Sequence, residues 1–232
     1  MPKNIVVFKI DKKIDFKNHL IGIDAYKRHK MTGEFLAYYK KLANAGEQGK
    51  YKIFLEKTKN FYAPSRKKFR DLLIKDTQEV WNLVEKKYIK KLEKIHNREF
   101  PYGRVYGIIS TAYRYGYGIL SDRKWFACSN NSPFVSIDIA MHEIMHFMFH
   151  YYFMEEWKKK FGLVDNQMWA IKESFSVLLN LECSNLMFSF DRGYPDHKKL
   201  REIIVKNWGK SKDFEKVLDK TCKYVKKNKL FL

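Results

Sequence analysis

The feature that most constrains this chain is the stretch "SIDIAMHEIMHFMFH", residues 136–150. On an α-helix, with about 100° between successive residues, Ile, Met and Phe cover almost the whole circumference. A helix that is apolar nearly all round lies inside a protein. Yet an unpaired polar group in such a place costs about 1–3 kcal/mol. The fold must therefore enclose this helix and also provide partners for its polar side chains.

Those side chains form one strip: with His142 at zero, His146 lies at about 40°, His150 at about 80° and Glu143 at about 100°. Imidazoles at i and i+4 can reach one ion, and a glutamate at i+1 points toward a metal-bound water. Zinc lowers the pKa of that water to about 7, so that a glutamate can take its proton. The HExxH spacing thus predicts His142 and His146 as zinc ligands and Glu143 as catalytic base. The alternative is a coincidental polar strip, because a bare HExxH is only moderately specific.

A catalytic zinc needs a third protein ligand. His150 lies about 12 Å along the axis from His142, too far to share one ion in a continuous helix, so we expect it to play a supporting role. A second apolar helix, "MWAIKESFSVLLNLE", carries a narrow polar strip of Glu173, Ser176 and Asn180. If the polar strips of the two buried helices face one ion, that ion accounts for the polar residues on both helices. Glu173 is therefore the predicted third ligand, and a salt bridge with one of the many lysines is the alternative.

"HEIMH" followed 27 residues later by a helical glutamate resembles the gluzincin branch of zinc metallopeptidases, which are thermolysin-like in arrangement. The uncharged residues around HExxH match that group as well, and the resemblance covers about residues 104–197. It implies a zincin-like fold, zinc ligands at His142, His146 and Glu173, and Glu143 as general base and proton shuttle. It also implies an edge strand that binds extended peptide, for which "RKWFACS" is the candidate.

The chain departs from that group at one position. Gluzincins often have an aspartate four residues after the third ligand, whereas this chain has Val177. We expect Asn180 or Asp138 to support the ligands instead. Such peptidases also use a Tyr or His donor to stabilise the oxyanion, and "DRGYPDHKK" offers Tyr194 and His197. The alternative for these two catalytic candidates is an ordinary role in a turn or helix cap.

The remaining sequence predicts an α+β fold in which the active-site helix packs among helices and a small antiparallel sheet. "NIVVFKI" is a predicted strand, and helices follow from Asp15 to about Asn60 with a break at "ANAGEQGK". An amphipathic helix of about 30 residues then begins near "APSRKKF", with Ser65 as its N-cap. "RVYGIISTAYRYGYGI" and "KWFACS" are predicted strands.

This pattern predicts two regions. Residues 1–100 form a mostly helical lobe with one short strand. Residues 101–232 form the zincin-like catalytic region with strands, the HExxH helix, the Glu173 helix and C-terminal helices. His19, His29 and His96 lie in lysine-rich segments, so we expect them at the surface.

Composition limits the remaining functional classes. The net charge is +20, but 37 of the 46 basic residues are lysines spread along the chain, so a lysine-rich surface explains it and nucleic acid is not a predicted partner. The three cysteines form no CxxC motif, which argues against a disulfide scaffold and against a zinc ribbon built from cysteines. The apolar run near the N-terminus is too short for a signal peptide or a membrane span, which favours the cytoplasm.

The sequence therefore predicts a zinc metallopeptidase that acts on a peptide or protein substrate. Two alternatives stay open. One is a DNA-associated protease of the SprT-like kind, which would suit the charge but uses a third histidine and often a Cys ribbon that is missing here. The other is a non-enzymatic, basic nucleic-acid-binding protein whose polar strip is structural.

Overall fold

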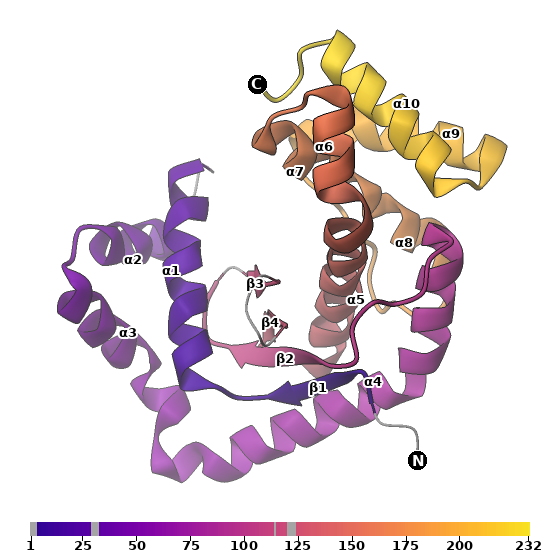
Figure 1. Ribbon diagram of the computed structural model, residues 1–232. Helices are drawn as coiled ribbons and strands as arrows, with labels where there is room; N and C mark the ends of the chain where they lie inside the picture. Colours follow the sequence, from indigo (N-terminus) through magenta and orange to yellow (C-terminus); the bar gives the residue numbers. More distant parts are fainter. Residues whose placement is uncertain (1–3, 29–32, 114, 120–123) are drawn as a thin grey trace. The chain divides into compact units, whose positions relative to one another are not determined.

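A computed structural model of the chain describes residues 4–28, 33–113, 115–119 and 124–232 (Figure 1). Its contacts divide the chain into two compact units. The first unit holds residues 1–83 and 103–139, and the second holds residues 84–102 and 140–232. Two long helices, α4 (Lys67–His96) and α5 (Pro133–Phe149), contribute residues to both units. This grouping differs from the division expected at residue 100, because the strands after that residue group with the N-terminal helices.

The first unit contains a four-stranded sheet with the order β1-β2-β4-β3. Its strands are β1 (Val6–Lys9), β2 (Val105–Ser110), β3 (Tyr117–Gly118) and β4 (Trp125–Ser129). The pairs β1–β2 and β2–β4 are parallel, and only β3–β4 is antiparallel. The prediction of an antiparallel sheet is thus wrong. Parallel strands need a long crossover, which the N-terminal helices provide between β1 and β2.

Strand β4 is not an edge strand, contrary to the expectation for "RKWFACS", of which Arg123 lies outside the described residues. It pairs with β2 on one side and with β3 on the other, and all five of its residues are buried. Beyond the short β3, the Ala127 N–H donates to the Gly116 carbonyl at 2.8 Å. The segment after β2 thus folds back and covers this side of β4. The residues of β4 form a continuous apolar run, which is typical of a strand buried on both faces.

The N-terminal helices match the predicted pattern. They are α1 (Lys12–Arg28), α2 (Gly33–Ala43) and α3 (Glu47–Tyr62), and the break between the last two falls in "ANAGEQGK". Helix α4 has the expected 30 residues. Ser65 is not its N-cap, because it lies inside a short 3-10 turn, η1 (Pro64–Arg66), that leads into α4 without a side-chain cap.

Two of the three histidines expected at the surface are fully buried, and His29 lies outside the described residues. In the first unit, His19 Nδ1 lies 2.6 Å from the Tyr38 hydroxyl, and Nε2 lies 3.0 Å from Thr111 Oγ1. In the second unit, the ring of His96 packs on Phe153 and Phe214. The prediction was wrong because lysines cover only the outer face of each helix, whereas the helical period turns these histidines inward.

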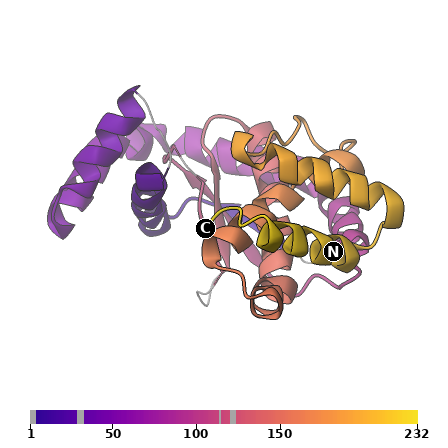
Figure 2. The ribbon, with the colours of Figure 1, turned by 90° about the horizontal axis from the view of Figure 1, so that it is seen from above.

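The second unit is helical. Helix α5 continues through a π-helical turn, η2 (His150–Met154), into α6 (Glu155–Phe161). The helices α7 (Asp165–Phe175) and α8 (Val177–Glu182) follow, and then a short turn, η3 (Pro195–His197). The last two helices, α9 (Lys198–Ser211) and α10 (Phe214–Lys227), lie side by side (Figures 1 and 2).

The stretch expected to form one helix over residues 168–182 is two helices that meet at Ser176. The Ser176 hydroxyl and N–H both donate to the Glu173 carbonyl, at 2.6 and 3.4 Å. These bonds tighten the turn after Glu173 and separate α7 from α8. Elsewhere, no helix in the described part of the chain is both long and apolar enough to cross a membrane.

Candidate metal centre

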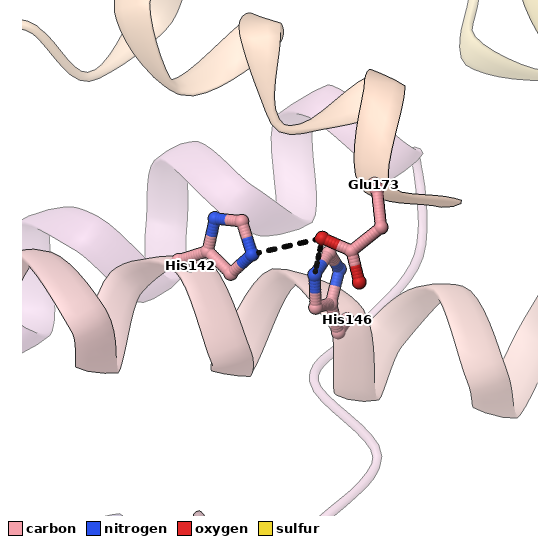
Figure 3. Close-up of side chains that lie close together, drawn as sticks. All are labelled: His142, His146 and Glu173. Carbon is pink, nitrogen blue, oxygen red and sulfur yellow. Dashed lines mark hydrogen bonds and ion pairs between the residues drawn. The ribbon is translucent and has the colours of Figure 1, made fainter. Parts of the chain in front are cut away.

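Helices α5 and α7 bring His142, His146 and Glu173 together, as the two polar strips predicted (Figure 3). One oxygen of Glu173, Oε2, lies 3.3 Å from His142 Nε2 and 3.2 Å from His146 Nε2. One ligand atom from each residue lies within 4.8 Å of the other two. His146 and Glu173 are buried, and His142 is partly exposed. The three residues therefore form a compact donor set that is accessible from one side.

This donor set fits a divalent metal ion. Two imidazoles and one carboxylate are the protein ligands of many catalytic zinc sites. Oε2 of the neighbouring Glu143 is buried and has no hydrogen-bond partner among the described residues. A buried carboxylate oxygen without a donor is costly, and a water held at the metal centre would supply one. The unsatisfied oxygen is thus a second observation that supports a metal here.

Glu143 also has the acidity that a base needs near neutral pH. Burial raises its pKa to about 7, against the positive charge of His142 and Lys172, which lowers it. A general base works best when its pKa lies close to the working pH. The role of Glu143 as the base stays a prediction.

A residue that sequence reasoning missed orients the first ligand. Asp191 Oδ2 lies 2.6 Å from His142 Nδ1, so the other ring nitrogen, Nε2, faces Glu173. Burial would raise the pKa of Asp191, but the contact with His142 outweighs it and lowers that pKa to about 2. A carboxylate on the far nitrogen is the usual support of a metal-binding histidine. Asp191 therefore has the supporting position that was expected of Asn180 or Asp138.

Asp191 is itself held rigidly. Arg201 Nη1 donates to its Oδ1 at 2.9 Å, and Nη2 donates to its carbonyl at 2.7 Å. The Ser176 hydroxyl lies 3.0 Å from the same Oδ1, and the Asn180 side chain exchanges two bonds of 2.8 Å with the Asp191 backbone. Gly193 has a φ of +62°, and a Cβ there would lie 2.5 Å from Arg201 Nη1. Asn180 thus supports the site through Asp191 rather than by touching a ligand.

The lysine salt bridge considered as the alternative for Glu173 is present, and its partner is Lys172. Lys172 is only 1% exposed, and its Nζ donates to Glu173 Oε1 at 2.7 Å. Burial opposes ionisation of Glu173, but its contacts with His146, Lys172 and His142 hold its pKa well below the usual value. No sequence signal distinguished Lys172 from the other lysines, because position and charge alone do not show which lysine turns inward.

Three further predicted site residues, His150, Tyr194 and His197, belong to the second unit. His150 begins the π-helical turn, where burial and the charge of Lys172 lower its pKa to about 4. Tyr194 and His197 pack around Trp169, one turn before Glu173 on α7, with ring centroids 5.2–5.3 Å apart. A part for either in oxyanion stabilisation stays a prediction. So does the supporting role of Asp138, which belongs to the first unit.

The three candidate ligands, Glu143 and Asp191 all come from the second unit. Such a set can hold a divalent ion that keeps a position open for water or substrate. Comparison of the chain with protein-family models, curated protein sequences and solved structures finds no match.

Proposed function

We propose that the protein is a zinc-dependent metallopeptidase whose metal is held by His142, His146 and Glu173. The observation that carries this proposal is that one oxygen of Glu173, on α7, lies 3.2–3.3 Å from a ring nitrogen of each histidine on α5. Charged carboxylates are rarely buried without a strong reason. Lys172 accounts for one oxygen of Glu173, Oε1. A metal between the other oxygen and the two histidines would account for Oε2 and for the HExxH spacing.

When bound, zinc supplies an acidified water and polarises the carbonyl of the peptide. The protein's own residues handle the proton. Glu143 Oε2, which is buried and unsatisfied, accepts the proton of the attacking water and passes it to the nitrogen of the leaving amine. Asp191 keeps His142 turned so that Nε2 faces the metal position. The substrate class that follows is a peptide or protein.

The proposal is tested by metal analysis of protein purified without chelator, together with peptide hydrolysis. We expect about one zinc per chain, which His142→Ala removes. Glu143→Gln should retain the zinc but lower hydrolysis by about 100-fold or more. Glu156→Gln, on the exposed surface of α6, is the matched control and should change neither. Protein without zinc, in which His142→Ala alters neither metal content nor activity, would contradict the proposal.

Two further variants separate the alternatives. Under the proposal, Glu173→Ala loses zinc and His197→Ala retains it. The reverse pattern would favour a DNA-associated protease with three histidine ligands. Steeply salt-dependent nucleic-acid binding without any proteolysis would favour a non-enzymatic basic protein.

A further inference from the structure

Lys172 is the least expected side chain of the second unit. It lies on α7 immediately before Glu173, and only 1% of it is exposed. Taking an ammonium group out of water costs several kcal/mol unless a partner of opposite charge compensates. Its Nζ donates to Glu173 Oε1 at 2.7 Å, a charge-assisted hydrogen bond. The buried lysine is thus directed at a candidate metal ligand.

The two oxygens of Glu173 have different neighbours. Oε2 faces the Nε2 atoms of His142 and His146, at 3.3 and 3.2 Å, while Oε1 faces Lys172. A carboxylate can bind a metal through one oxygen or through both. If Glu173 used both, it would fill a position that a catalytic zinc keeps open for water or substrate. The contact with Lys172 occupies Oε1 and leaves Oε2 for the metal.

We propose that Lys172 is a positioning residue that holds Glu173 as a one-oxygen ligand and so keeps a coordination position of the metal open. This inference rests on the metal centre of the proposed function but not on a peptide substrate. A buried cation suits this role better than a neutral donor, because a charge-assisted bond is about twice as strong as a neutral one. The alternative is that Lys172 only balances the charge of Glu173, without any effect on how that residue binds the metal.

The experiment uses the full chain loaded with cobalt(II) in place of zinc, and the visible absorption of the cobalt reports its coordination number. Wild type should show the strong absorption of a four-coordinate ion. In Lys172→Met, the freed Oε1 should enter the coordination shell, so that the absorption weakens. X-ray absorption of the zinc-loaded variant should show one additional oxygen neighbour. Lys172→Arg, which retains a cation, should restore the wild-type spectrum.

Lys91→Met is the matched control. Lys91 also lies in the second unit, but its Nζ donates to the Glu182 carbonyl, away from the three ligands. Its removal should leave the spectrum unchanged. If Lys172→Met does not fold, Lys172→Gln serves in its place: its neutral amide holds Oε1 less strongly than the ammonium, so the cobalt absorption should fall, but by less than for Met.

The outcomes separate this inference from the proposed function. Cobalt-loaded variants at Lys172 with the wild-type spectrum and an unchanged zinc shell would overturn the inference alone. Wild-type protein that takes up no cobalt would overturn the metal centre, and the inference with it. A coordination number that depends on Lys172, in a protein that hydrolyses no peptide, would support the inference and contradict the peptidase.

Discussion

At the scale of single residues, the contact between His142 Nδ1 and Asp191 Oδ2 decides which ring nitrogen faces Glu173. A histidine that presents the wrong nitrogen, or a ring that turns freely, is a poor metal ligand. The two positions are 49 residues apart in sequence, and Asp191 lies in an irregular loop, so no local pattern reveals the pair.

Asp191→Asn should therefore weaken zinc binding by about 10–100-fold, because the amide retains the shape of the side chain but loses the charge that orients His142. Competition with a chromophoric chelator measures the affinity. Asp165→Asn, at an exposed carboxylate of the same unit, is the control and should bind zinc like wild type. Equal affinity of Asp191→Asn and wild type would show that the contact does not orient the ligand.

At the scale of elements, the junction between α7 and α8 connects the site to the helices behind it. The Ser176 hydroxyl contacts the Glu173 carbonyl, Asp191 Oδ1 and Arg201 Nη1. Ser176→Ala should lower the free energy of unfolding by about 1–3 kcal/mol, since it leaves buried groups unsatisfied. Urea denaturation measures this change. Ser174→Ala is the control, because that hydroxyl only donates to the Ala170 carbonyl within α7, and its effect should be smaller.

In the first unit, a buried carboxylate joins α1 to the end of β2. Asp15 accepts hydrogen bonds from the Ser110 hydroxyl, the Thr111 N–H and hydroxyl, and the Tyr62 hydroxyl, at 2.6–2.9 Å. Asp15→Asn places an NH2 group against these donors and should lower the free energy of unfolding by about 3 kcal/mol. Asp24→Asn, on the exposed side of α1, is the control. Because Asp15 lies outside the second unit, zinc affinity should not change in the folded protein.

At the scale of the whole molecule, a buried histidine in each unit makes stability depend on pH. Burial lowers the pKa of both His19 and His96 to about 4; Asp15 opposes the shift of His19 and Lys57 adds to it. The unfolded chain takes up these protons below about pH 6.5, but the folded chain does so only near pH 4. The stability that each neutral histidine contributes is thus complete above pH 6.5 and is lost as the pH falls toward 4.

His96→Leu isolates one of these contributions. Between pH 7 and pH 4, the loss of unfolding free energy in this variant should be smaller than in wild type by about 3 kcal/mol. Glu143 acts in the opposite direction, because burial raises its pKa, but it does so equally in both proteins and cancels in the difference. Urea titrations at several pH values measure the effect. Parallel curves for the two proteins would contradict the burial of a neutral His96.

The features that could be predicted from the sequence are those that depend on local periodicity. The sequence predicted that the HExxH helix is buried, that Glu173 lies on a second buried helix with a polar strip facing the same place, and that a helix of about 30 residues begins near Ser65. Those inferences need only the helical period and the cost of an unpaired buried polar group. The break at Ser176 could not be predicted, because two hydrogen bonds to the Glu173 carbonyl create it and the apolar period does not change there.

The features that depend on contacts between distant segments could be seen only in the folded structure. It made the sheet mostly parallel and placed β4 inside it, because strand order follows from the crossovers and not from the strands' own residues. It brought Asp191 into contact with His142, and it placed Lys172, one of 37 lysines, against Glu173. A side chain's type states which bonds it can make, but the packing of the chain decides which partner lies within reach.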